Sequence, residues 1–211
     1  MDMTENNAYF NADRNDLLQF LSTDKVFNHA LDIGCAAGVL GRQMVAASLV
    51  SCVDGIEINA DVAKQAAMIL HKVWHGSVEN VLPSIELSNY DLVTMADSLE
   101  HLSDPWQVLT DLHKNAVVGT RLLVSVPNIR EKNVLLPLLF HGRFEYQNSG
   151  IMDRTHLHFF TRSSLINILS ETGWIVEKTQ ANIKRKYLKW WYPHHLLEEF
   201  IAVQYFALAY K

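Results

Sequence analysis

Short hydrophobic runs alternate with segments of helical periodicity from about residue 30 to residue 120. This alternation indicates repeated strand and helix units, which form a parallel sheet with helices on both faces. Strands are predicted at residues 29–34, 51–58, 71–78, 90–97 and 121–127, with helices between them at residues 39–48, 59–70 and 105–117.

Local signals mark the ends of these helices. Asn59 precedes the second helix as an N-cap residue would, and Asp104 with Pro105 opens the third. Gly119 follows the third helix, and we expect it to terminate that helix as a C-terminal glycine.

The pattern loosens after the fifth strand. Residues 128–161 contain prolines, glycines, aromatic residues and histidines, and long irregular segments in compact domains are commonly lids or binding loops. A helix is predicted at residues 163–173, with Ser163 as its cap and Gly173 as its stop. Two further strands are expected at residues 174–183 and 205–211. The sequence thus predicts an α/β fold, a doubly wound seven-stranded sheet with a lid and acceptor region inserted after strand 5.

The composition is that of a globular protein, with 49% hydrophobic and 19% charged residues, which argues against extensive disorder. We expect one domain over residues 1–211, of which residues 1–28 form an N-terminal cover. The net charge of −5 gives no general attraction to phosphate backbones, so nucleic acid is not expected as a partner. The basic and aromatic run at residues 184–191 is either a solvated surface segment or a contact for an anionic ligand or membrane surface.

The two cysteines indicate a reducing compartment. Cys35 and Cys52 fall at the ends of adjacent predicted strands and are expected to be reduced packing residues, which fits the cytoplasm. The polar, acidic N-terminal residues have no apolar core of the kind a signal peptide needs. No apolar stretch approaches the roughly 20 residues that span a bilayer. The aromatic residues of the C-terminal connection could form the face of a homodimer.

A glycine-rich turn, LDIGCAAGVLG, lies where the first strand gives way to the first helix. At this place in open α/β sheets the bare backbone and the free amides of the helix approach a nucleotide-containing cofactor. Its glycines at positions 34, 38 and 41 do not fit the dinucleotide pattern GxGxxG, because Ala36 occupies the second required position.

Two acidic residues accompany this turn. Asp32, two residues before Gly34, suits a cationic amino acid group and would repel a pyrophosphate. Glu57 ends the second strand, where a carboxylate can accept hydrogen bonds from ribose hydroxyls. The turn and the two acids together predict S-adenosylmethionine as the cofactor.

These residues resemble the class I S-adenosylmethionine-dependent methyltransferases over nearly the whole chain. The resemblance implies a Rossmann-like sheet with an antiparallel last strand. LDIGCAAG resembles the family's glycine motif, VDGIEIN its ribose-binding strand end, HGSVEN its adenine-contacting segment and YDLVTMADSLEHLSDP the exit of its fourth strand. The cofactor-binding residues that it implies are Asp32, Gly34, Cys35, Ala36, Gly38, Glu57, Ile58, Ser77, Val78, Ala96 and Asp97, with Tyr9 from the N-terminal cover.

A narrower resemblance concerns the acceptor. The strings YFNADRNDLL, SLEHLSDPW and GIMDRTHLHFFTRSSL are similar to a bacterial subgroup related to the ubiquinone-biosynthesis methyltransferases, often associated with surface polysaccharides or secondary metabolites. This resemblance implies O-methylation of a small hydroxylated acceptor, a sugar or a quinone-like ring. The alternatives are an N-methyltransferase, a non-catalytic module that binds the cofactor and, more remotely, an NAD-dependent oxidoreductase.

Methyl transfer to a hydroxyl needs positioning, desolvation and a base. Histidine changes protonation near neutral pH, and we expect His156 first and His101 second as the catalytic residue, ahead of His158. In DRTHLHFF the two histidines are expected on one face of a strand-like segment, with Asp153 orienting one of them. The alternative is that these histidines only fasten the lid to the core.

Other features of the sequence leave two interpretations each. Tyr9, Phe10 and Arg14 either fold over the cofactor or belong to an N-terminal helix packed on the sheet. No HxxxH, HExxH or CxxC pattern is present, so no metal is expected. Five aromatic residues indicate either an apolar acceptor pocket or local core packing: Phe140, Phe144, Tyr146, Phe159 and Phe160.

Overall fold

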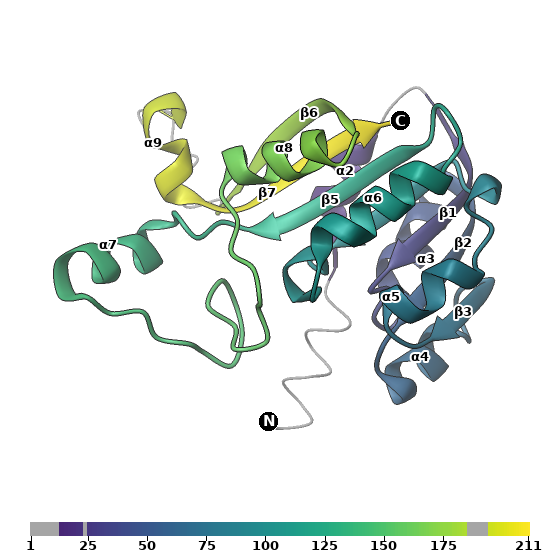
Figure 1. Cartoon of the computed structure of the whole chain (residues 1–211), viewed down its shortest axis with the longest axis horizontal. Coiled ribbons are helices and arrows are strands. Elements are labelled where there is room, and N and C mark those ends of the chain that lie inside the picture. The colour runs from purple at the N-terminus through teal and green to yellow at the C-terminus, as the bar shows by residue number, and fades with distance from the viewer. Residues whose placement is uncertain (1–12, 23–24, 185–193) are drawn as a thin grey trace.

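The computed structural model describes residues 13–22, 25–184 and 194–211. Its strands form one seven-stranded sheet in the order β3-β2-β1-β4-β5-β7-β6 (Figure 1). Five strands run parallel: β1 (Phe27–Ile33), β2 (Val50–Glu57), β3 (Lys72–His75), β4 (Leu92–Ala96) and β5 (Arg121–Pro127). β7 (Ala202–Tyr210) is antiparallel to both of its neighbours, β5 and β6 (Ile175–Ile183). The predicted doubly wound, mostly parallel sheet with an antiparallel last strand is confirmed.

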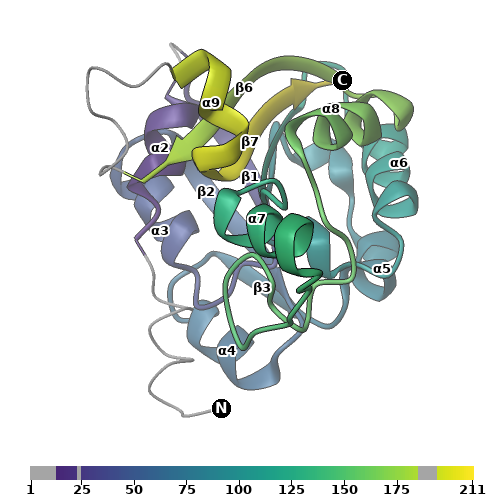
Figure 2. The same ribbon diagram turned by 90° about the vertical axis from the view of Figure 1, so that its left-hand side faces the viewer.

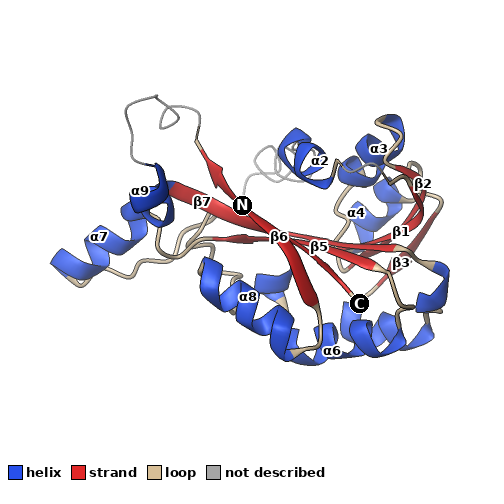
Figure 3. Ribbon diagram, turned by 90° about the horizontal axis from the view of Figure 1, so that it is seen from above, coloured by secondary structure: helices blue, strands red, loops and turns tan. Residues whose placement is uncertain are grey.

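Helices cover both faces of the sheet, as Figure 3 shows. One face carries α2 (Asn15–Leu21), α3 (Val39–Ala46) and α4 (Ala60–Ala66). The other face carries α5 (Val78–Val81), α6 (Pro105–Asn115) and α8 (Arg162–Glu171). Each set packs its apolar side chains against the sheet in a core of its own. Three short 3-10 helices lie in the connections: η1 (Leu82–Ser84), η2 (Leu87–Asn89) and η3 (Leu99–His101).

The predicted N-caps of two helices are confirmed. The Asn59 side chain accepts hydrogen bonds from the backbone amides of Asp61 and Val62, at the start of α4. The Asp104 side chain accepts one from the amide of Gln107, and Pro105 is the first residue of α6. These contacts satisfy amides that have no partner within the helix.

Several predicted boundaries are wrong. The helix expected at residues 59–70 ends at Ala66, and the last strand, expected to begin at residue 205, begins at Ala202. α8 is capped by Thr161, which forms a reciprocal capping box with Ser164, and Ser163 lies inside the helix. α6 ends at Asn115, so Gly119 does not terminate it and instead occupies a turn with a φ of 91°. The strand predicted over residues 71–78 ends at His75, because the chain bends at a glycine with positive φ before α5.

The region predicted as an irregular lid contains a helix. α7 (Lys132–His141) begins with Glu131, whose side chain accepts a hydrogen bond from the Asn133 amide. With α9 (His194–Ile201) it stands out at one end of the sheet (Figures 1 and 2). None of the α7 residues is buried, so the sequence of α7 shows no periodic apolar face of the kind that indicates a helix. Pro137 within α7 also argues against a helix in the sequence.

The N-terminal segment is partly described. α2 buries Leu17, Phe20 and Leu21 against the sheet, as an ordinary N-terminal helix does. Tyr9 and Phe10, expected in a cover over the cofactor, lie outside the described residues, as do residues 185–191 of the basic run. Within the described part of the chain, no helix combines the length and apolarity needed to span a bilayer.

Candidate active site

The glycine turn follows β1 at the carboxyl edge of the parallel strands. Gly34 and Gly38 have φ values of 74° and 81°, in the left-handed region that glycine adopts without strain. Ala36 has a φ of 48°, which is costly for a residue with a Cβ. The amides of Gly34 and Cys35 both donate to the carbonyl of Ile56 on β2, at 2.9 and 3.1 Å. The turn is therefore fixed against the neighbouring strand.

Bare backbone is required at two glycines near this turn. A Cβ at Gly34 would lie 2.8 Å from the Cβ of Ser98, at the exit of β4. A Cβ at Gly55 on β2 would lie 2.5 Å from the Sγ of Cys35. These close approaches bring the ends of β1, β2 and β4 together.

Glu57 lies over the glycine turn. The residue is buried, and its Oε2 accepts a hydrogen bond from the Ala36 amide at 3.0 Å while Oε1 accepts one from the Asn59 amide at 2.8 Å. Each carboxylate oxygen has two lone pairs, so acceptor capacity remains for hydroxyl donors. The arrangement fits the expected role of Glu57 at a ribose.

Asp32 is buried at the end of β1. Its Oδ1 accepts a hydrogen bond from Thr94 Oγ1 at 2.6 Å. Burial raises the pKa of Asp32 from 3.8 to about 6, although the Thr94 hydrogen bond and the Arg14 charge oppose this shift. A cationic ligand group would stabilise the ionised form, so the site fits the ammonium end of S-adenosylmethionine.

The residues expected near the adenine, Ile58, Ser77 and Val78, differ in the exposure of their side chains. Ile58 follows β2 and is 70% exposed, so its apolar side chain is free to contact a base. Ser77 holds the N-cap position of α5 and makes no side-chain capping bond. The Val78 side chain is buried in the core, which leaves its backbone as the part that can face a ligand.

Asp97, next to Ala96 at the exit of β4, is held by residues distant in the sequence. Its carboxylate accepts hydrogen bonds from Arg14 Nη1 at 2.7 Å, Ser125 Oγ at 2.6 Å and Gln204 Nε2 at 2.9 and 3.0 Å. These partners come from the start of α2, from β5 and from β7. Asp97 therefore joins three elements around the site, and its left-handed φ of 53° is fixed by that network.

His156 is buried beside the exit of β4. Its Nδ1 lies 3.0 Å from the carbonyl oxygen of Ile151, which assigns the ring proton to Nδ1 and leaves Nε2 as an acceptor. Burial, the largest influence, lowers the pKa of His156. The His101 ring packs edge-on against it with 4.8 Å between centroids, and His101 Nδ1 lies 3.2 Å from the Thr155 carbonyl.

Glu100 belongs to the string that resembles the exit of the family's fourth strand, but no role of its own was predicted for it. Its carboxyl is buried, and within the described part of the chain neither oxygen has a hydrogen-bond partner. Burial, with a smaller contribution from Asp97, raises the pKa of Glu100 well above its ordinary value. Glu100 Oε1 lies 4.0 Å from His156 Nε2. The Glu100 carbonyl also accepts hydrogen bonds from the amides of Leu157 and His158, which fastens residues 157–158 of the lid to η3.

A family model described as a methyltransferase domain matches residues 3–179, more than half of the chain. This chain belongs to the methyltransferase domain family. The methyltransferase is 34% identical over 122 residues to the mitochondrial ubiquinone biosynthesis O-methyltransferase of Candida albicans, covering 52% of this chain and 37% of that protein. For the Schizosaccharomyces pombe protein of the same name the identity is 31% over 153 residues, 69% of this chain and 54% of that one. The chain thus spans about half or less of these relatives.

Solved structures show the same fold. A SAM-dependent methyltransferase from Archaeoglobus fulgidus matches with a TM-score of 0.73 over 100% of both chains, at 18% identity. A possible histamine N-methyltransferase from Thermotoga maritima matches with a TM-score of 0.66, at 14% identity over 98% of this chain and 90% of that one. The predicted family and its cofactor, S-adenosylmethionine, are confirmed.

Some expectations about the lid of the methyltransferase are wrong. The DRTHLHFF segment is not a strand. The Asp153 carboxylate accepts hydrogen bonds from Thr155 and not from the His156 ring, which is oriented by the backbone carbonyl of Ile151. His158 packs edge-on against Trp106, with 5.7 Å between ring centroids, whereas His156 packs against His101 and Phe159.

The aromatic residues of the lid divide into three groups. Phe144, Tyr146 and Phe159 pack together, with ring centroids 5.6 to 6.2 Å apart. Phe159 also lies 6.4 Å from the His156 ring, so this cluster reaches the candidate base. Phe160 belongs to the main core, and Phe140 on α7 is 70% exposed.

Metal donors are also gathered here. Glu100, His101 and His156 each offer a donor atom, and these atoms lie within 4.8 Å of one another. The expectation of no metal rested on the absence of local sequence motifs. Such motifs detect only ligands close together in the sequence, whereas His101 and His156 are about 55 residues apart.

Proposed function

We propose that this methyltransferase transfers the methyl group of S-adenosylmethionine to a hydroxyl group of a small acceptor. The observation that carries the proposal is the buried pair of His156 and Glu100 at the carboxyl edge of the sheet. The names of the curated relatives, ubiquinone biosynthesis O-methyltransferases, support a hydroxyl acceptor and favour a quinone-like ring over a sugar.

The cofactor, when bound, supplies a methyl group on a sulfonium that is already activated for displacement. Asp32 would hold its ammonium group and Glu57 its ribose hydroxyls, as the positions and spare acceptor capacity of these carboxylates suggest. The flanking residues from the glycine turn and from β4 would line the rest of its path: Gly34, Cys35, Ala36, Gly38, Ala96 and Asp97.

His156 Nε2 takes the proton of the acceptor hydroxyl as the new oxygen–carbon bond forms. Because burial lowers the pKa of His156, the imidazole is neutral near pH 7 and able to act as a base. Burial raises the pKa of the Glu100 carboxyl, 4.0 Å from Nε2, and so favours its protonated form. The imidazolium formed at His156 would favour ionisation of Glu100, which then supplies a counter-charge. The aromatic cluster of Phe144, Tyr146 and Phe159 would bind the apolar part of the acceptor.

The test is the substitution His156→Ala, with His158→Ala as the matched control on the same segment. Turnover of dihydroxylated aromatic acceptors should fall by roughly 10² to 10⁴ for His156→Ala, the usual contribution of a general base. S-adenosylhomocysteine binding, measured by calorimetry, should stay within a factor of a few. Unchanged turnover would remove His156 from the mechanism, and turnover of amines by His156→Ala would support N-methylation instead.

The remaining expectations stay predictions. These are the single domain, the cytoplasmic location, the homodimer and the absence of nucleic acid as a partner. The two cysteines, Cys35 and Cys52, are both free thiols, which supports a reducing location.

A further inference from the structure

Four potential metal ligands converge at the amino edge of the sheet, opposite the glycine turn. His29 lies on β1, Cys52 and Asp54 on β2, and His71 directly before β3. His29 and Cys52 are register partners on adjacent strands, and Asp54 pairs with Lys72, the neighbour of His71. The sheet itself therefore brings the four side chains together, and one donor atom from each lies within 4.8 Å of all the others.

The contacts of Asp54 indicate that its side chain and the two histidines converge on one position. Asp54 is buried, with Oδ1 2.8 Å from His71 Nδ1 and Oδ2 3.1 Å from His29 Nε2. The His29 approach is close, yet within the described residues Nε2 makes no aligned hydrogen bond and is shielded from solvent. A nitrogen and a carboxylate oxygen that lie close together without a hydrogen bond between them can both coordinate the same metal ion. A hydrogen bond to Asp54 thus accounts for His71, whereas His29 approaches Asp54 without an aligned hydrogen bond.

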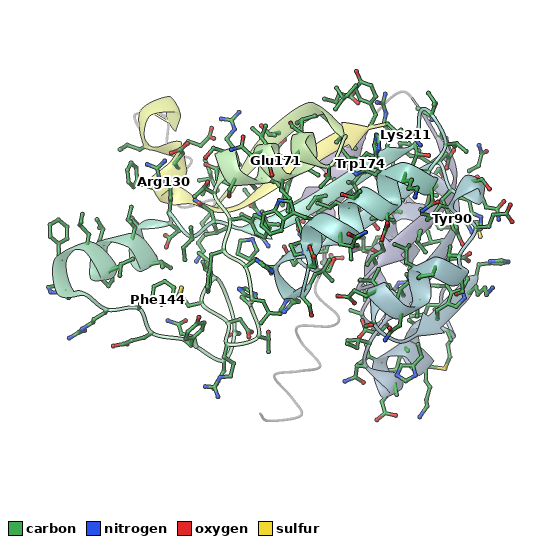
Figure 4. All side chains as sticks on the ribbon, in the orientation of Figure 1. Tyr90, Arg130, Phe144, Glu171, Trp174 and Lys211 are labelled. Carbon is green, nitrogen blue, oxygen red and sulfur yellow. The ribbon has the colours of Figure 1, made fainter. Side chains whose placement is uncertain are left out.

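The surroundings supply an outer shell and a path to solvent. Tyr90, just before β4, donates its hydroxyl to Asp54 Oδ2 at 2.7 Å, as outer groups do for carboxylate ligands. Figure 4 shows Tyr90 at the other end of the molecule from Phe144 in the lid. His29, Asp54 and His71 border an open hollow of about 550 Å³, lined also by Lys72, Trp74 and Glu86. Cys52 lines a neighbouring hollow together with His71, whose side chain is 64% exposed. An ion can therefore reach the four ligands.

We propose that His29, Cys52, Asp54 and His71 bind a Zn²⁺ ion. Two imidazoles, a thiolate and a carboxylate form a ligand set that zinc accepts in tetrahedral sites. Bonds of about 2.0 to 2.3 Å at tetrahedral angles place ligand atoms roughly 3.3 to 3.8 Å apart, so the donors need only small rotations. Cys52 releases its thiol proton to solvent as the zinc–sulfur bond forms, and both imidazoles bind as neutral groups.

The predicted site is structural. Four protein ligands leave no open coordination position, and His29, Cys52 and His71 lie toward the amino ends of the strands, away from the glycine turn and Glu57. The ion would join β1, β2 and the segment that leads into β3. Zinc is therefore expected to stabilise the fold and to take no part in methyl transfer.

The test titrates the full chain, free of any affinity tag and treated with a chelator, with Zn²⁺ in a calorimeter. We expect one tight site per chain. Cys52→Ser and His71→Gln should weaken Zn²⁺ binding by about a hundredfold or more, and Tyr90→Phe by about tenfold, as for an outer-shell partner. His141→Gln, at the exposed end of α7, is the matched control and should bind Zn²⁺ as the wild type does.

Cobalt identifies the sulfur ligand independently. The Co²⁺-loaded wild type should show the absorption of a tetrahedral site with thiolate charge transfer, and Cys52→Ser should lose the charge-transfer band. Zn²⁺ should also raise the Tm of the wild type but not of Cys52→Ser or His71→Gln, with far-UV circular dichroism confirming that both variants fold. Equal Zn²⁺ affinity in wild type and Cys52→Ser would overturn the proposal, because it would place the ion elsewhere, for instance at His101 and His156; an absence of tight binding would overturn it as well.

Discussion

Replacing Asp32 by asparagine should stabilise the free protein at neutral pH. The buried carboxyl has its pKa raised from 3.8 to about 6, chiefly by burial. The unfolded chain therefore ionises Asp32 near pH 4, whereas the folded protein keeps the proton until about pH 6. This group's contribution to stability is complete below pH 4 and is lost as the pH rises through 6. At 1.36 kcal/mol per pKa unit, the loss is about 3 kcal/mol.

The same carboxylate should make cofactor binding depend on pH. If ionised Asp32 holds the ammonium group, the ligand binds the ionised form, of which about nine-tenths is present at pH 7 and about a tenth at pH 5. S-adenosylhomocysteine should therefore bind the wild type about tenfold more weakly at pH 5 than at pH 7. Asp32→Asn should bind weakly at both pH values, with little difference between them.

Two measurements examine this reasoning. Urea denaturation from pH 4 to pH 8 gives the stability difference between Asp32→Asn and wild type, which should grow towards neutral pH and level off above pH 7. Calorimetry with S-adenosylhomocysteine gives the affinities. The control is Asp61→Asn, an exposed carboxylate paired with Lys64 on the surface of α4. A stability difference that does not change with pH would refute the buried-carboxyl argument, and pH-independent ligand affinity would refute the ammonium contact.

Three other substitutions test the site. Ala36→Gly removes a left-handed alanine and, after the entropy cost of glycine, should raise the unfolding free energy by up to about 1 kcal/mol; a lower Tm would contradict this. Gly55→Ala places a Cβ 2.5 Å from Cys35 Sγ. The overpacking should lower the unfolding free energy by about 1 to 3 kcal/mol and weaken S-adenosylhomocysteine binding. An unchanged Tm in thermal melts, or unchanged affinity in calorimetry, would contradict this. Glu100→Gln should become more stable relative to wild type as the pH rises above 4.5, because the unfolded wild type ionises there while burial keeps the folded carboxyl protonated. The difference in unfolding free energy, from urea titrations, should grow by up to about 1.4 kcal/mol per pH unit. A difference that does not change with pH would mean that Glu100 is ionised in the folded protein.

The central sheet was predictable because its strands are continuous apolar runs covered on both faces. The strand expected at residues 121–127 is β5, with the same bounds. The glycine turn was equally predictable from the sequence, since Gly34 and Gly38 both adopt the positive φ that their positions implied. α7 was not predicted, because a helix without buried residues has no periodic face.

The polar contacts of the site could not be predicted from local patterns. Asp97 is held by Arg14 and Gln204, which are 83 and 107 residues away in the sequence. Glu100 owes its raised pKa to burial, and a glutamate in the sequence gives no sign of being buried. The histidine His156 was identified by its chemistry, but the carbonyl of Ile151 that orients it follows from the path of the loop.

The position of β7 within the sheet has a consequence for the order in which the chain can fold during synthesis. β6 leaves the ribosome first, yet its neighbour in the sheet is β7, which also pairs with β5 on its other side. Until residues 202–210 emerge, both β5 and β6 have an unpaired edge that invites pairing with other chains. We therefore expect the nascent protein to acquire its final sheet only after β7 has been released, and to depend on chaperones until that moment.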